Sequence, residues 1–117
     1  MQYMVLIYSS ENTGPEPGTD EFGPYMQGYF DFTEKCRADG KLVSADALQP
    51  VATATTLTLE NGKVETTDGP FAETKEQLGG YYLLDCENLD EALEYAAMIP
   101  TATHGRVEVR PIMIFDN

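Results

Sequence analysis

Apolar residues follow two patterns along the chain, short runs that predict strands and a three- to four-residue period that predicts helices. The first run, Tyr3 to Tyr8, is continuously apolar, which is typical of a central strand buried on both faces. Ser9 to Gly18 is rich in Gly and Pro and is expected to form a loop. From Phe22 to Cys36 apolar side chains recur at helical spacing, and Gly40 suits the end of such a helix.

A β-hairpin is the clearest local prediction in the middle of the chain. Leu42 to Leu48 is predicted to be a strand that ends before Pro50. Thr55 to Glu60 then alternates apolar Leu with polar Thr, and the Asn61-Gly62 pair is typical of a type I′ turn. Lys63 to Thr67 is expected to return as the second strand of this hairpin.

The last part of the chain predicts a strand, a helix and a final strand. Gly80 to Cys86 is another apolar strand. Asn88 is a suitable N-cap for the second helix, with Glu91 three positions on as its capping-box partner. Val107 to Phe115 is predicted as the last strand, in which Pro111 marks a sheet edge or a bulge because it has no N–H to donate.

The predicted order is strand, helix, strand, hairpin, strand, helix, strand. Without the hairpin this is a split βαβ pair, so the expected fold is an α+β ferredoxin-like sandwich in a single domain, residues 1–117. Both helices would cover one face of an antiparallel sheet. Since no helix remains for the other face, we expect a homodimer packed sheet to sheet as a dimeric α/β barrel, with room for a cavity between the sheets.

The net charge of the chain limits the kinds of partner that it is expected to bind. The chain has 117 residues and carries 20 acidic against 7 basic residues, a net charge of −13. Such a surface repels nucleic-acid phosphates and anionic membranes, so neither is an expected partner. The acids either keep the protein dispersed or attract a basic partner, and their spread along the chain favours the former. No apolar run approaches a membrane span and no basic segment precedes Tyr3, so a cytoplasmic location is expected.

The sequence contains few residues that could bind a metal ion or a cofactor. Cys36 and Cys86 are the two cysteines, no CxxC pair exists, and His104 is the single histidine. A zinc site within one chain is therefore not expected, and the sequence predicts no cofactor. Both cysteines are expected to be small apolar fillers of the core, while a disulfide between them stays open.

The segment Thr67 to Tyr82, TDGPFAETKEQLGGYY, closely resembles the DGPF branch of the YCII-related proteins. The resemblance continues nearly end to end, through Tyr3 to Tyr8, Ala47 to Pro50 with Ala54 to Thr56, and Val107 to Pro111. It implies a ferredoxin-like subunit that dimerises into an α/β barrel. Some members of this branch occur beside extracytoplasmic-function sigma factors, which implies a link to transcriptional regulation and a sigma-factor-related protein partner.

A more distant relative in the wider superfamily is a lactone dehydrochlorinase that works through an acid and a histidine on its first helix. The first predicted helix of this chain has no histidine, and the position nearest to it is about Tyr29. The resemblance thus implies Tyr29 as one candidate for a catalytic role.

The other candidate site residues lie in the loop from Asp68 to Lys75 of the segment Thr67 to Tyr82, called the signature loop. These are Asp68, Gly69, Pro70, Phe71, Glu73 and Lys75. Asp68 is either an acid/base at the rim of a pocket, with a pKa raised by burial or by Glu73, or a cap of its own turn. Phe71 either lines a ligand or anchors the loop. Lys75 either meets an anionic ligand or pairs with a neighbouring glutamate.

Two roles are open for each of the polar candidate residues outside the signature loop. Tyr8, Tyr25 and Tyr29 either supply hydroxyls to a pocket or are core or interface residues with one satisfied hydroxyl. Arg106 and Arg110 lie on one face of the last predicted strand, where they form either an anion site or part of a salt-bridge ladder.

Two functions from different classes remain open on the sequence. The first is a dimeric module that binds a small ligand or regulates transcription through a protein partner. The second is a cofactor-free enzyme that moves a proton on a small carbonyl- or carboxylate-bearing metabolite, with Asp68 and either Tyr29 or His104 as acid and base. His104, in the turn after the second helix, is otherwise a surface loop residue.

Overall fold

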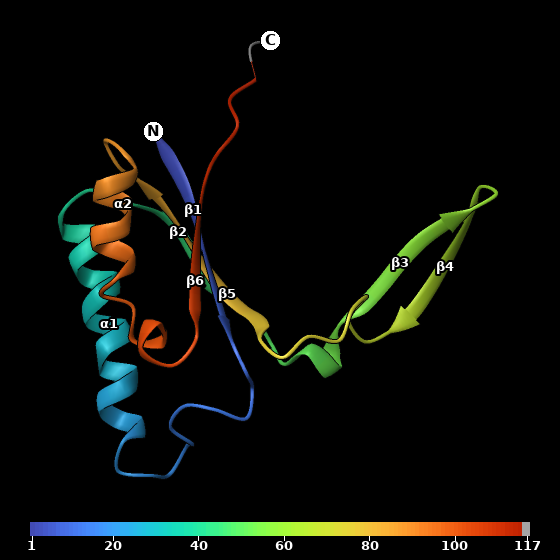
Figure 1. Cartoon of the computed structure of the whole chain (residues 1–117), viewed down its shortest axis with the longest axis horizontal. Coiled ribbons are helices and arrows are strands. Elements are labelled where there is room, and N and C mark those ends of the chain that lie inside the picture. Colours follow the sequence, from blue (N-terminus) through green and yellow to red (C-terminus); the bar gives the residue numbers. More distant parts are fainter. Residues whose placement is uncertain (116–117) are drawn as a thin grey trace.

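The computed structural model describes residues 1–115 and arranges them in two α-helices and six strands (Figure 1). In chain order the elements are β1 (Gln2–Ser9), α1 (Phe22–Ala38), β2 (Leu42–Ala47), η1 (Val51–Thr53), β3 (Thr55–Glu60), β4 (Lys63–Asp68), β5 (Gln77–Asp85), α2 (Leu89–Ala96), η2 (Pro100–Thr103) and β6 (Arg106–Pro111). The two elements labelled η are short 3₁₀ helices. Neither α1 nor α2 has the length and apolar character that a membrane span requires.

Four strands form one antiparallel sheet in the order β2-β5-β1-β6, and β3 and β4 pair as a separate hairpin. Both helices lie on one side of the sheet, and the hairpin projects away on the other side (Figure 1). The predicted α+β class, the element order and the hairpin are confirmed. The chain by itself is an open sheet and not a closed barrel.

The core lies between the helices and the face of the sheet that they cover. Its buried apolar residues are Tyr3, Val5, Ile7, Phe32, Cys36, Tyr82, Leu84, Cys86, Ala92, Ala96 and Ile99. The central strand β1 contributes every second residue to this list, while the residues between them, Met4, Leu6 and Tyr8, are only half-buried. The prediction that β1 is buried on both faces is therefore wrong for the single chain, because the second face has no cover among residues 1–115.

The two cysteines are free thiols in the core, in agreement with the prediction that they are small apolar fillers. Cys36 projects from α1 and Cys86 directly follows β5, and both are almost fully inaccessible to solvent. Burial raises the pKa of the Cys36 thiol to about 11, with a smaller contribution from the nearby carboxylate of Asp39. Both side chains serve as apolar packing groups rather than as nucleophiles.

The second helix begins as predicted, at a side-chain cap. The Asn88 side-chain oxygen accepts a hydrogen bond from the Glu91 backbone N–H at 2.9 Å. The Glu91 carboxylate reaches back to the Glu87 N–H, one residue before the cap, and also pairs with Lys41 at 2.7 Å. These contacts satisfy N–H groups at the helix start and tie α2 to the beginning of β2.

The last strand is shorter than predicted. β6 ends at Pro111, and Ile112 to Phe115 do not continue it, although the Ile112 N–H still donates to the Gln2 carbonyl. The reason is that β6 is an edge strand and Pro111 already pairs with Tyr3, the second residue of β1, which is the neighbouring strand. The apolar residues that follow, Met113, Ile114 and Phe115, are strongly exposed.

Helix α1 approaches η2 closely at a glycine. A Cβ built on Gly28 would lie 2.9 Å from Cγ of Pro100, which is closer than side chains tolerate. We expect Gly28→Ala to lower the free energy of unfolding by about 1 kcal/mol, because overpacking of about 1–3 kcal/mol outweighs a gain in helix propensity of up to about 1 kcal/mol. Urea unfolding followed by circular dichroism measures this change.

The matched control for this prediction lies on the same helix. A Cβ on Gly23 would meet nothing within 4 Å, so Gly23→Ala is expected to leave the stability unchanged or to raise it by up to about 1 kcal/mol. Equal stabilities for the two variants would contradict the close packing of α1 on Pro100.

Candidate functional site

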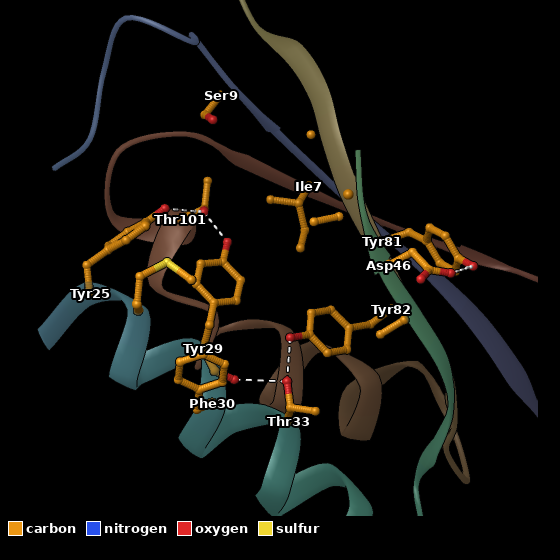
Figure 2. A pocket seen from close by; sticks show the side chains of 15 residues that line it. Ile7, Ser9, Tyr25, Tyr29, Phe30, Thr33, Asp46, Tyr81, Tyr82 and Thr101 are labelled. Atoms are coloured by element: carbon orange, nitrogen blue, oxygen red, sulfur yellow. Dashed lines mark hydrogen bonds between the residues drawn. The ribbon is translucent and has the colours of Figure 1, made fainter. Parts of the chain in front are cut away.

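A cavity of about 490 Å³ lies between α1 and one end of the sheet (Figure 2). On the helix side it is lined by Tyr25, Met26, Tyr29, Phe30 and Thr33. On the sheet side it is lined by Ile7, Ala45, Asp46, Ala47, Gly79, Gly80, Tyr81 and Tyr82, with Ser9 and Thr101 at its end. The walls are thus largely aromatic and aliphatic, with hydroxyl groups concentrated on one side.

Local sequence explains why space remains here. Tyr25, Tyr29 and Thr33 follow one another at intervals of four residues, so they lie along one face of α1 and point at the sheet. The sheet opposite them carries Gly80, where a Cβ would meet the Asp46 carbonyl at 2.9 Å. Small residues on this part of β2 and β5 therefore allow the two strands to approach, and they leave the volume above the sheet unfilled.

Hydroxyl groups from the helix converge on a buried threonine of η2. The Thr101 Oγ1 lies 2.8 Å from the Tyr25 hydroxyl and is also hydrogen-bonded to the Tyr29 hydroxyl. Thr101 is 2% exposed, and the two tyrosine rings meet edge to face at 5.6 Å. Since a threonine hydroxyl has one proton and two acceptor lone pairs, it donates at most one of these bonds and accepts at least one of them. Figure 2 shows this cluster on one wall of the cavity.

A second hydroxyl pair lies deeper along the same wall. The Thr33 hydroxyl donates to the Tyr29 carbonyl at 2.9 Å, and its oxygen lies 2.7 Å from the Tyr82 hydroxyl (Figure 2). With the Thr33 proton engaged by the carbonyl, the Tyr82 hydroxyl donates to Thr33. This pair joins α1 to β5 across the core, where the Tyr82 ring also packs edge to face on Phe32.

The tyrosine hydroxyls of the cavity are held in their neutral form. Burial raises the pKa of Tyr29 well above its ordinary value, and the adjacent Tyr25 adds to this effect. Burial also raises the pKa of Tyr82, against the opposing effect of its bond to Thr33. At neutral pH these groups act as hydrogen-bond donors and acceptors and carry no charge.

The single histidine lies at the end of the hydroxyl cluster. His104 Nε2 is 3.3 Å from the Tyr25 hydroxyl, and the two rings are 5.8 Å apart. Its other ring nitrogen, Nδ1, is buried and has no hydrogen-bond partner among residues 1–115. The loop before α1 passes over this ring at Gly14, where a Cβ would be 3.2 Å from it. His104 is thus a half-buried turn residue that also forms part of the cluster.

The signature loop lies away from the cavity. Asp68 ends β4 at the base of the hairpin and is exposed, and within residues 1–115 its carboxylate has no hydrogen bond or ion pair. The turn that follows is closed by the backbone and by a threonine: the Gly69 N–H donates to the Ala54 carbonyl at 2.7 Å, and the Thr56 hydroxyl donates to the Gly69 carbonyl. Asp68 is therefore neither a cap of its own turn nor a neighbour of Tyr29 in the single chain.

The other residues of the signature loop are equally open to solvent. Phe71 is 90% exposed, so it does not anchor the loop. Glu73 and Lys75 are exposed, and no ion pair of Lys75 occurs in the described part of the chain. Glu76 lies 3.9 Å from Arg106 instead. In one copy of the chain, none of the candidate residues Asp68, Gly69, Pro70, Phe71, Glu73 and Lys75 lines the cavity.

The residues that complete the site were not apparent from the sequence. Of the candidates, Tyr25, Tyr29 and His104 come together, but Thr101, Thr33 and Tyr82 were missed. The four-residue spacing from Tyr25 to Thr33 was a usable signal for a hydroxyl-bearing helix face. Thr101 gave no such signal, because its position depends on how η2 packs against α1.

Comparison with known proteins places these observations in a family. The YCII-related domain matches residues 1–116. An uncharacterized protein of Rhizobium meliloti (strain 1021) is 39% identical to the chain over 117 residues, which covers 98% of this chain and 94% of that protein.

The raised pKa of Tyr29 predicts a pH dependence of stability. The unfolded chain releases this proton near pH 10 while the folded protein retains it, so stability from this group is present below about pH 10 and is lost as the pH rises further. We expect Tyr29→Phe to flatten this alkaline loss in urea unfolding. An ultraviolet phenolate titration of wild type minus Tyr29→Phe that shows ionisation at about pH 10 would contradict the burial of this hydroxyl.

Proposed function

Because the chain belongs to the YCII-related family, we propose from its own cavity that it binds a small molecule between α1 and the sheet. One observation carries this proposal: the hydroxyls of Tyr25, Tyr29 and Thr101 converge on one wall of a cavity whose lining is mostly apolar. Ligand sites typically combine a concave apolar surface with a few converging polar groups. A volume of about 490 Å³ is within the range of such sites.

The lining indicates the class of ligand. Among residues 1–115, Asp46 is the one charged residue of the lining. Its side chain lies on the face of the sheet away from the helices, where its carboxylate accepts a hydrogen bond from the Tyr81 hydroxyl at 2.9 Å (Figure 2). In the described part of the chain no lysine or arginine lines the cavity to neutralise an anion, and the chain carries a net charge of −13. We therefore propose an uncharged ligand with an apolar or aromatic body and a carbonyl or hydroxyl group that bonds to the tyrosines.

The more specific predictions for this chain depend on the resemblance of the segment Thr67 to Tyr82 to the DGPF branch. Membership of the DGPF branch, a ferredoxin-like subunit in a dimeric α/β barrel, a cytoplasmic location and a link to a sigma factor all remain predictions. Within this proposal the chain is a homodimer packed sheet to sheet, which the half-buried second face of β1 supports. A regulatory module would use the same cavity, with ligand binding as the signal that changes a protein contact.

A second candidate function is proton transfer, which the position of His104 favours. The hydrogen bonds run from His104 through Tyr25 and Thr101 to Tyr29, so one titratable group is connected to the cavity through hydroxyls. In such an enzyme a C–H bond next to a carbonyl of the ligand breaks, its electron pair moves into an enolate, and the proton passes to His104. Return of the proton to the same carbon completes an exchange that needs no cofactor.

A thermal-shift screen tests ligand binding. We expect a small uncharged carbonyl compound or phenol to raise the Tm by several degrees, since a ligand at a hundred times its Kd stabilises by about 2.7 kcal/mol. Tyr29→Phe is expected to raise the Kd about fivefold, equivalent to the loss of one hydrogen bond of about 1 kcal/mol.

The control variant is Tyr95→Phe. The Tyr95 hydroxyl donates to Asp39 at 2.6 Å, away from the cavity, so this change removes a phenolic hydrogen bond without touching the lining. If every hit binds Tyr29→Phe and Tyr95→Phe equally well, the ligand does not occupy the proposed cavity.

Hydrogen–deuterium exchange distinguishes the enzyme from the binding module. In deuterated buffer the enzyme would replace the hydrogen beside the carbonyl of a screened ligand with deuterium, which NMR detects as the loss of that signal. His104→Gln is expected to slow this exchange by at least about a hundredfold while the ligand still binds. Binding without exchange in the wild type would refute the proton-transfer function and leave the binding function intact.

A further inference from the structure

The hairpin β3–β4 has one apolar face that nothing in the described chain covers. Pairing places Leu57 opposite Thr66 and Leu59 opposite Val64, so these side chains share one face of the two-stranded ribbon. Leu57, Leu59 and Val64 are 57%, 66% and 60% exposed. The alternate positions, which include Thr56, Thr58, Glu60, Lys63, Glu65 and Thr67, form a polar face.

Such a hairpin needs a partner surface. An isolated two-stranded ribbon is at best marginally stable in water, because it buries too little apolar area to offset its conformational entropy. Figure 1 shows that the hairpin extends away from the body of the molecule, on the side of the sheet opposite the helices. The hairpin and the uncovered face of the sheet are therefore available to the same partner.

The uncovered face of the sheet is suited to a second copy of the chain. The register places Met4 and Leu6 of β1 beside Leu83 and Tyr81 of β5 on this face, and all four are half-buried. Its charged residues are Asp46, Asp85, Arg106, Glu108 and Arg110. Three acids against two arginines leave this face close to neutral in a chain of net charge −13, so like-charge repulsion between two copies is least here.

Charge complementarity connects the base of the hairpin to this face. Asp68 pairs with Thr55 in the hairpin register and so lies on the same face as Leu57 and Leu59. Its exposed carboxylate has no countercharge among residues 1–115. The open face of the sheet carries two of the chain's seven cationic side chains, Arg106 and Arg110, on the edge strand β6. Arg106 lies 3.9 Å from Glu76 and Arg110 lies 3.2 Å from Glu108, and both arginines stay largely exposed to a further carboxylate.

We propose that the hairpin Thr55–Asp68 is an arm that clasps a second copy of this chain. Its apolar face packs against the other copy at the margin of the open sheet, beside the sheet-to-sheet contact, and Asp68 faces the arginines at positions 106 and 110 of that copy. This inference rests on the sheet-to-sheet homodimer proposed above. In a twofold dimer each copy supplies one arm and one face, so both exposed apolar surfaces are covered by a single closed interface.

The test compares two double variants that add the same charge to opposite faces of the arm. Sedimentation equilibrium measures the dimer Kd, and far-UV circular dichroism checks the fold. We expect Leu57→Lys with Leu59→Lys to raise the Kd at least about a hundredfold. Thr58→Lys with Thr67→Lys, on the polar face, is expected to change it by less than about fivefold.

The outcomes separate the arm from the dimer itself. A wild type that stays monomeric at all concentrations overturns both. A dimer that both double variants leave intact overturns the arm and leaves the sheet-to-sheet dimer standing. Equal weakening by the two double variants also overturns the arm, because the effect would then not depend on the face.

A pair of single variants tests the role assigned to Asp68. Asp68→Asn is expected to raise the dimer Kd about fivefold to tenfold at low salt and to reduce its dependence on salt concentration, since one intermolecular ion pair is lost. Glu65→Gln, which removes the same charge from the polar face, is expected to leave the Kd unchanged or to lower it. Equal effects of the two variants would overturn the contact of Asp68 with the second copy.

Discussion

The packing of both helices on one face of the four-stranded sheet is the constraint on which the other features of this chain depend. Phe32 and Cys36 of α1 and Ala92 and Ala96 of α2 close that face over the alternate residues of β1 and β5. This packing uses the buried residues of both helices, so the second face of the sheet has no cover within residues 1–115. The apolar side chains of that face are therefore accessible to another molecule.

The same packing creates the cavity. Where α1 continues past the core towards its N-terminal end, the sheet opposite carries alanine and glycine, and the helix carries tyrosines. Large rings on one side and small residues on the other leave a volume that the rings line but do not fill. The buried Thr101 holds the two tyrosine hydroxyls, because both would lose hydrogen bonds to water without a partner there. The polar cluster thus has a structural role as well as the proposed role in ligand recognition.

Much of the fold was predictable, because the chain keeps a clear period in each element. The alternation of Leu and Thr around Asn61-Gly62 led to the hairpin, and the Asn88 cap located the start of α2. The extent of the last strand was not predictable, since apolar residues after Pro111 look like strand residues whether or not a neighbouring strand is there to pair with them. Hydrogen-bond partners for an edge strand are a property of the assembled sheet.

The sequence by itself determined the element order, the α+β class, the amphipathic hairpin and the surplus of apolar surface, because these depend on residue type and short-range spacing. Tertiary structure alone decided which polar groups meet. It brought Thr101 and His104 to Tyr25 across more than seventy residues, and it separated Asp68 from Tyr29. Contacts between residues so far apart in the sequence follow from the packing of whole helices and strands, and local sequence patterns do not predict that packing. For this reason the conspicuous signature loop and the site built around Tyr29 occupy different parts of the molecule.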